Sequence, residues 1–98
     1  MHENNIVHLD LKPENIMCET KTSTNIKICD FGLATKLDPN EIVKVSPATV
    51  EFAVPEIVDH DAVGFYTDMW AVGVLAYVIL SGFSPFGGDD EADTKENI

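Results

Sequence analysis

The most constraining feature of this sequence is a twelve-residue stretch, 69–80, in which every residue except Gly73 is apolar. With a rise of about 1.5 Å per residue, such a helix is ~18 Å long, too short for the roughly 30 Å core of a bilayer. A helix that is apolar on all sides belongs inside a protein, where neighbours cover it. Since 98 residues provide only one small core, the stretch predicts an internal piece of a larger domain.

The chain is strongly acidic, with 17 Asp and Glu, 6 Lys, no Arg and a formal net charge of −11. Residues 50–98 carry −9 of this charge, from one Lys and ten acids. Such a chain cannot neutralise several phosphates, which argues against nucleic acid and against anionic membranes as partners. The acidic run at 89–96 predicts a solvated helix start or tail, with a site for basic partners as the alternative.

Short apolar runs bounded by turn residues predict strands at 15–18 and 26–29, paired antiparallel, and Ile6-Val7 is a candidate third strand. The two cysteines, Cys18 and Cys29, form no C-x-x-C pair, and we expect two buried free thiols.

In the following region the apolar residues recur with neither the period of a helix nor that of a strand. Residues 36–51 include Pro39 and Pro47 and predict a surface loop. Pro55 is suited to begin a short helix that runs through Asp59.

Four short motifs follow one another along the chain. They are His8-Leu9-Asp10-Leu11-Lys12-Pro13-Glu14-Asn15, Asp30-Phe31-Gly32, Val54-Pro55-Glu56 and Asp68-Met69-Trp70. Each alone is compatible with a turn, a loop or a helix cap, but four in this order and at these spacings are not expected by chance. Together they resemble the catalytic half of a protein kinase, and the resemblance covers essentially the whole chain.

This resemblance implies an α+β fold. Residues 1–98 would be a partial kinase domain, a fragment of the large (C-terminal) lobe, with short strands around the catalytic loop followed by helices. The Gly-rich loop and the strand lysine of the small lobe have no counterpart in the sequence. The small lobe and the end of the large lobe are therefore expected outside these residues.

The resemblance also assigns roles to the first motif. Phosphoryl transfer requires an oriented nucleophile, bridging metal ions and neutralised charge. Asp10 would orient the substrate hydroxyl and accept its proton, and Lys12 would reach the transferred phosphate as a point charge. Asn15 and Asp30 would hold Mg²⁺ through hard oxygen atoms. With Lys12, Asn15 and Asp30, Glu14 completes the set expected to bind the cofactors, ATP and Mg²⁺.

Other positions follow by resemblance. Thr49 would bond to the catalytic Asp and Lys, and Asp68 would receive backbone N–H groups of the catalytic loop. A helix N-cap at Thr67 or Asp68 is an alternative that is compatible with this role. His8 and Phe31 resemble members of the stacked apolar column of active kinases. Glu56 normally pairs with an Arg, and this chain contains none.

One departure and several local matches narrow the resemblance. Leu9 replaces the Arg that grips an activating phosphate in many kinases, so a phosphate on Thr35, Ser46 or Thr49 would lack that partner. His8-Leu9-Asp10, 49–56, 68–74 and 81–86 resemble the myosin light-chain kinase-like group. Within it they are nearest the kinase domains of twitchin and projectin, giant invertebrate muscle proteins related to titin.

The subgroup implies partners and a location. The partners would be a protein substrate with Ser or Thr, by charge a basic one, and an autoinhibitory tail or calcium–calmodulin-type regulator outside these residues. Neither a nucleic acid nor a membrane is expected as a partner. The location would be cytoplasmic, and more finely sarcomeric or cytoskeletal.

Two functions remain open on the sequence. In the first, the residues are part of an active serine/threonine kinase, and the isolated 98 residues are inactive. In the second, they form a non-catalytic binding or scaffold piece, pseudokinase-like, whose apolar helix drives association.

Overall fold

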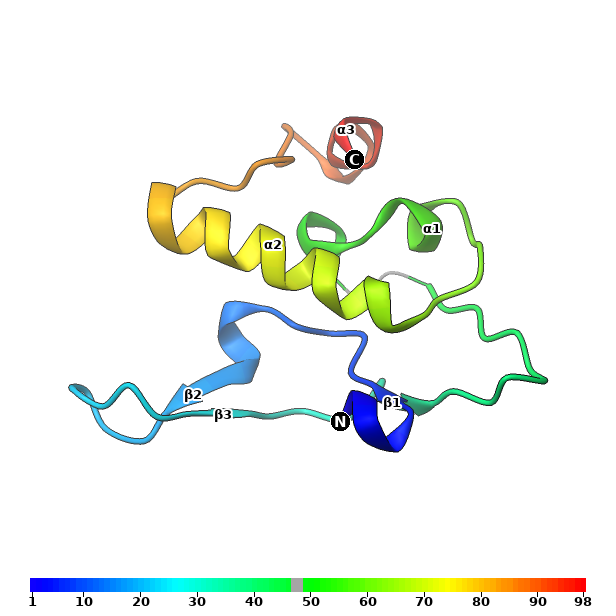
Figure 1. Ribbon diagram of the computed structural model, residues 1–98. Coiled ribbons are helices and arrows are strands. Elements are labelled where there is room, and N and C mark those ends of the chain that lie inside the picture. The colour runs from blue at the N-terminus through cyan, green and yellow to red at the C-terminus, as the bar shows by residue number, and fades with distance from the viewer. Residues whose placement is uncertain (47–48) are drawn as a thin grey trace.

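The computed structural model describes residues 1–46 and 49–98, and combines short strands with helices (Figure 1). The first half contains the strands and two turns of 3-10 helix, and the second half contains the α-helices. The elements in chain order are η1 (His2–Asn4), β1 (Ile6–Val7), η2 (Pro13–Asn15), β2 (Ile16–Cys18), β3 (Ile26–Ile28), β4 (Thr35–Lys36), η3 (Val50–Phe52), α1 (Pro55–Val58), α2 (Phe65–Ser81) and α3 (Glu91–Asn97). The mixture agrees with the predicted α+β class.

The strands β2 and β3 form an antiparallel hairpin, as predicted. Ile16 lies opposite Ile28, Met17 opposite Lys27, and Cys18 opposite Ile26. The backbone N–H of Cys29 donates to the carbonyl of Asn15, which extends the pairing to the loop before β2. The hairpin therefore holds the end of the loop 8–15 next to the beginning of the Asp30-Phe31-Gly32 motif.

Ile6-Val7 is a strand, but it does not join the hairpin. It pairs antiparallel with β4, with Ile6 opposite Lys36 and Val7 opposite Thr35. The interpretation of residues 36–51 as loop was incomplete, because it did not foresee β4 at one end or η3 at the other. Pro47, which supported that interpretation, lies outside the described residues.

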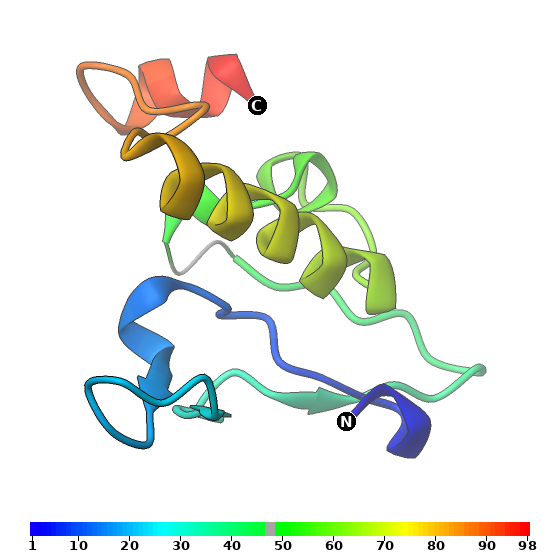
Figure 2. The same ribbon diagram turned by 60° about the vertical axis from the view of Figure 1, so that its left-hand side comes forward.

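The apolar stretch lies within α2, which crosses the middle of the molecule between the strands and the other two helices (Figures 1 and 2). The helix begins after Gly64, whose backbone N–H donates to the Thr67 hydroxyl. It ends at Gly82, which takes a left-handed φ of 79° and donates its N–H to the Val78 carbonyl. A left-handed residue after a helix favours glycine, since no Cβ clashes there.

Only one side of α2 is covered. Thr67, Asp68, Ala71, Val74 and Leu75 are buried. The other side is open, and its large apolar residues include Ile79 at 70% and Leu80 at 88% exposure. The structure therefore confirms that, within these residues, neighbours do not surround this helix completely. None of the helices in the described ranges is long and apolar enough to cross a membrane.

The short helix α1 begins at Pro55, as predicted, and carries part of the core. Val54, Ile57 and Val63 form a buried cluster beside α2. The acidic run begins α3, where the Asp90 carboxylate accepts a hydrogen bond from the backbone N–H of Asp93. The cysteines are free, but Cys18 is exposed and Cys29 only half-buried. Their predicted burial was wrong, because β2 and β3 form an open hairpin with little cover.

Candidate active site

The loop 8–15 passes along α2 and is fixed to it by a buried carboxylate. The backbone N–H of His8 donates to Asp68 Oδ2 at 2.8 Å, and the N–H of Leu9 donates to Asp68 Oδ1 at 2.9 Å. Asp68 is 3% exposed, so each of its oxygens depends on these partners. The expected contact between this carboxylate and the loop backbone is thus present, while the N-cap of α2 is Gly64 rather than Thr67 or Asp68.

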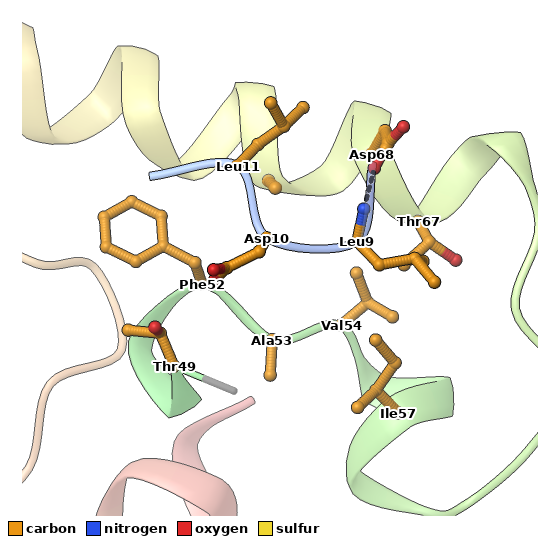
Figure 3. Close-up of a pocket in the computed structure, with 11 residues that line it drawn as sticks. Leu9, Asp10, Leu11, Thr49, Phe52, Ala53, Val54, Ile57, Thr67 and Asp68 are labelled. Carbon is orange, nitrogen blue, oxygen red and sulfur yellow. Dashed lines mark hydrogen bonds between the residues drawn. The ribbon is translucent and has the colours of Figure 1, made fainter. Parts of the chain in front are cut away.

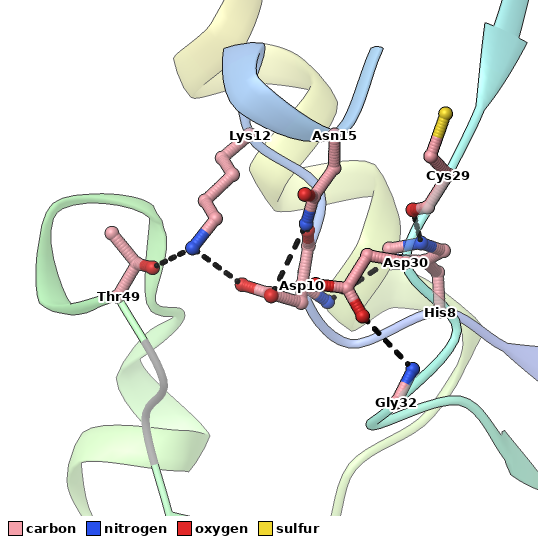
Figure 4. A network of polar contacts seen from close by, with 8 residues as sticks. All are labelled: His8, Asp10, Lys12, Asn15, Cys29, Asp30, Gly32 and Thr49. Carbon is pink, nitrogen blue, oxygen red and sulfur yellow. Dashed lines mark hydrogen bonds and ion pairs between the residues drawn. The ribbon is translucent and has the colours of Figure 1, made fainter.

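The Asp10 carboxylate is held on both oxygens by residues of its own loop (Figure 4). Lys12 Nζ lies 3.5 Å from Oδ1. The Asn15 side-chain amide donates to Oδ2 at 3.1 Å and to the Asp10 carbonyl at 2.7 Å. Charge-assisted contacts on both sides fix the orientation of a carboxylate.

Thr49 joins this network from the opposite segment. Lys12 Nζ donates to the Thr49 hydroxyl at 2.9 Å. Of the two bonds expected for Thr49, the structure contains the one to Lys12, and the described contacts include none to Asp10. Lys12 therefore connects the loop 8–15 by a hydrogen bond to Thr49, the residue immediately before η3.

Asp30 is positioned through His8, which is fully buried. The Asp10 N–H donates to His8 Nδ1 at 3.2 Å, so Nε2 carries the proton and donates to the Cys29 carbonyl at 2.9 Å. The imidazole thus joins the backbone at Asp10 to the residue immediately before Asp30. Its ring also packs edge-on against Phe31, with centroids 5.2 Å apart, as expected if both side chains belong to one stacked column.

The local backbone at Asp30 is unusual. Its φ is 58°, in the left-handed region, and its Oδ1 accepts a hydrogen bond from the Gly32 N–H at 3.2 Å. Non-glycine residues in this region are uncommon and concentrate at functional sites. The turn leaves Asp30 Oδ2 without a hydrogen bond from the described residues.

The donor set suits magnesium. Asn15 uses its amide nitrogen for Asp10, and its Oδ1 accepts no hydrogen bond from the described residues. One amide oxygen and one carboxylate oxygen, on Asn15 and Asp30, are therefore available as hard ligands. Across the described ranges no three His, Cys, Asp or Glu side chains are grouped as a metal site, so these two oxygens would need phosphate or water to complete a coordination shell. Glu14 is exposed and takes no part in the network.

A cavity of about 20 Å³ lies between the loop 8–15 and residues 49–57 (Figure 3). Small-molecule sites usually measure about 300–1,000 Å³, so this cavity does not hold a nucleotide. A larger hollow of about 360 Å³ lies beside Thr49 and is bordered by Glu51 and by Asp89, Asp90 and Glu91. Four acidic residues therefore border the hollow beside Thr49.

Two contacts were not foreseen. His2, which lies outside the four motifs, bonds through Nε2 to Asp68 Oδ2 at 2.9 Å. Glu56, expected to pair with an Arg, accepts a hydrogen bond from the Thr67 hydroxyl at 3.4 Å. Both join residues that are distant in sequence or outside the motifs, and no local pattern signals them.

Comparison with known proteins agrees with this geometry. The family model described as "Protein kinase domain" matches residues 1–98. The titin homolog of Caenorhabditis elegans is 58% identical over the whole chain, and the chain covers so little of that protein that the share rounds to 0%. Myosin light chain kinase family member 4 of Homo sapiens is 56% identical over the whole chain, which covers 25% of it. The chain therefore spans at most a quarter of these relatives.

Solved structures give the same result. The twitchin kinase region from C. elegans matches with a TM-score of 0.92 and 59% identity, over 100% of this chain and 17% of that one. Titin kinase with its flanking domains matches with a TM-score of 0.87 and 42% identity, over 99% of this chain and 18% of that one. The chain belongs to the protein kinase family, and its relatives are titin, twitchin and the myosin light chain kinases.

Proposed function

We propose that these residues are part of a serine/threonine protein kinase that transfers the terminal phosphate of ATP to hydroxyl groups of proteins. The observation that carries the proposal is the position of Lys12 Nζ, 3.5 Å from the Asp10 carboxylate and 2.9 Å from the Thr49 hydroxyl. Phosphoryl transfer requires an oriented nucleophile and positive charge near the phosphate, and a carboxylate and a cation held together on one loop can provide both. The names of the myosin light chain kinase relatives support it.

Each residue then has a distinct role. Asp10 orients the substrate hydroxyl and accepts its proton at the carboxylate, which Asn15 and Lys12 hold in place. Lys12 places a positive charge beside the transferred phosphate, and Thr49 fixes its ammonium group. Because Lys12 contacts both partners, the loop and the segment at 49 must be in position together.

Asn15 and Asp30 would hold Mg²⁺, and Lys12, Glu14, Asn15 and Asp30 together would serve the bound nucleotide. When bound, the metal supplies positive charge that offsets the charge of the phosphates. The free oxygens of Asn15 and Asp30 support this assignment. The assignment of Glu14 rests on the sequence resemblance.

We also propose that residues 1–98 form a partial kinase domain, with the catalytic loop, the activation segment and the central helix of the large lobe. The fixation of the loop 8–15 on α2 by Asp68 supports a helix-based lobe. No Gly-rich loop is present in the sequence. We therefore propose that catalysis requires a longer polypeptide, called the parent kinase below, and that the 98 residues alone are inactive.

The substrate would be a protein with basic residues near the accepting Ser or Thr. The acidic hollow beside Thr49 and the net charge of −11 support this. A regulatory tail or a calcium–calmodulin-type partner would control the parent kinase. The similar twitchin kinase fragment of C. elegans, described as an autoregulated protein kinase, supports such control. By its muscle relatives, the parent kinase would be cytoplasmic and located at the sarcomere or cytoskeleton.

A second function is a non-catalytic binding piece. The observation that favours it is the open apolar side of α2, with Ile79 and Leu80 largely exposed. Large exposed apolar patches promote association. Self-association of the purified 98-residue chain, measured by analytical ultracentrifugation, together with a parent kinase that lacks phosphate transfer, would favour this function over the first.

The test of the kinase function uses the parent kinase, Mg-ATP and a basic Ser-containing peptide. Asp10→Asn should lower kcat by a factor of about 10² or more, because the proton acceptor is lost. Asp30→Asn should raise the Mg²⁺ concentration needed for half-maximal rate. The matched control is Asp61→Asn at an exposed position outside the site, which should retain full activity. Full activity of Asp10→Asn would refute the proposal.

A further inference from the structure

Leu9 has a strained backbone immediately before Asp10. Its φ is 66°, in the left-handed region that branched side chains rarely adopt. Such residues persist only where the surroundings hold them in place. Here the Leu9 N–H donates to the buried Asp68 Oδ1 at 2.9 Å, which secures the backbone from one side.

The side chain of Leu9 holds the loop by a second interaction, apolar packing. It packs against the buried cluster of Val54, Ile57 and Val63, which Val43 and Val45 also contact. In Figure 3 the Leu9 side chain extends toward Val54 and Thr67, whereas the Asp10 carboxylate extends toward Phe52 and Thr49. Adjacent residues thus face opposite sides, one into apolar packing and the other into the polar network.

Val43 and Val45 belong to the segment that joins the Asp30 turn to Thr49. The backbone N–H of Val63 donates to the Val43 carbonyl at 2.9 Å, which ties this segment to the same cluster. Leu9 and the segment therefore share one apolar cluster, and both ends of that segment lead to proposed site residues. The contacts within the cluster are apolar and need no charged group.

We infer that Leu9 is a positioning residue, whose apolar packing on the cluster it shares with Val43 and Val45 fixes segment 43–45 relative to Asp10. The inference rests on the proposed function of Asp10. If the packing is lost, the backbone at Leu9 can relax from its left-handed conformation and carry Asp10 with it. Small displacements of a reacting group reduce the rate much more than they reduce binding.

The test compares Leu9→Ala with Leu9→Met in the parent kinase. Leu9→Ala should lower kcat about tenfold and leave KM for ATP within about twofold, because loss of the packing lets the backbone at Leu9 relax and displaces Asp10. Leu9→Met, which restores a side chain of similar volume, should return kcat to within about threefold of the original. Hydrogen exchange of the amides at 43–46 should be faster in Leu9→Ala than in Leu9→Met.

Ile42→Ala is the matched control, because Ile42 lies in the same segment but is 77% exposed. It should alter neither kcat nor exchange. If Leu9→Ala does not fold, Val45→Ala removes packing from the same cluster on the side of the segment and should lower kcat in the same way. An unaltered kcat, or a lowered kcat with unaltered exchange at 43–46, would overturn the inference. The proposed function fails separately, if Asp10→Asn keeps full activity.

Discussion

The backbone N–H of Leu9 donates a 2.9 Å hydrogen bond to the carboxylate of Asp68, 59 residues later in the chain. A second bond, from the N–H of His8, uses the other oxygen of the same carboxylate. A single buried side chain of α2 thus fixes the residue before Asp10. The candidate catalytic loop is therefore fixed to α2 at His8 and Leu9, in addition to its contacts with the β2–β3 hairpin.

Asp68→Asn should destabilise the chain. The variant keeps the side-chain volume but replaces one acceptor oxygen with an NH₂ group, so one buried backbone N–H loses its partner. The expected loss is about 1–3 kcal/mol in the free energy of unfolding, measured by urea denaturation. Asp61→Asn, at an exposed position, serves as the control and should change stability little. Equal stability of the two variants would contradict the assigned role of Asp68.

Thr49→Val should impair the reaction more than binding in the parent kinase. Valine keeps the shape of threonine but cannot accept the hydrogen bond from Lys12 Nζ. A hydrogen bond to a charged group contributes about 1.5–3 kcal/mol, so kcat should fall about tenfold or more, with KM for ATP nearly unchanged. Thr49→Ser, which keeps the hydroxyl, should retain most of the activity. A Thr49→Val enzyme with normal kcat would show that this contact is dispensable.

Two glycines of the α2 region should respond to alanine in opposite directions. Gly82 has a φ of 79°, and a Cβ there is strained, so Gly82→Ala should lower the free energy of unfolding by about 1 kcal/mol. Gly73 lies inside the helix, and beyond the helix's own backbone a Cβ there would meet no atom of the described residues within 4 Å. Gly73→Ala should therefore raise the free energy of unfolding by roughly 0.5–1 kcal/mol. Thermal denaturation of both variants of the chain checks the two signs, and equal signs would contradict the assigned conformations.

Trp70 should tolerate phenylalanine better than alanine. Its indole stacks on Phe86 with ring centroids 5.6 Å apart, but its buried Nε1 has no hydrogen-bond partner among the described residues. Trp70→Phe keeps an aromatic ring and removes the unsatisfied donor, so its cost should stay within about 1 kcal/mol. Trp70→Ala should cost about 3 kcal/mol, because it also opens a cavity. Urea denaturation of both variants measures the difference, and equal costs would argue against the packing role.

Local patterns predicted several elements correctly. The strands predicted at 15–18 and 26–29 were found at 16–18 and 26–28, and the short helix at Pro55 was confirmed, because apolar runs and proline act within a few residues. The partner of β1 was not predicted. Thr35-Lys36 has no apolar alternation, and its pairing with Ile6-Val7 depends on a contact between segments that are far apart in the sequence.

In the candidate site, too, some features were predicted from the sequence and others were found only in the structure. The motifs named Asp10, Lys12, Asn15 and Asp30 because each lies at a fixed spacing along the chain. The resemblance also led us to expect the contact of Lys12 with Thr49, whereas the contact of His8 with the Cys29 carbonyl is known only from the structure. The bond between His2 and Asp68 joins residues 66 positions apart, and nothing in the neighbourhood of His2 signals it.

The sequence by itself determined the family, the short elements and the identity of the polar residues, since these depend on residue type and spacing. The tertiary structure decided which polar groups share one network and which apolar side chains hold the loop. Leu9 illustrates the difference: in the sequence it is only the residue that replaces an arginine. In the fold its N–H reaches Asp68 and its side chain reaches the cluster around Val54, because burial brings distant segments to the same small volume.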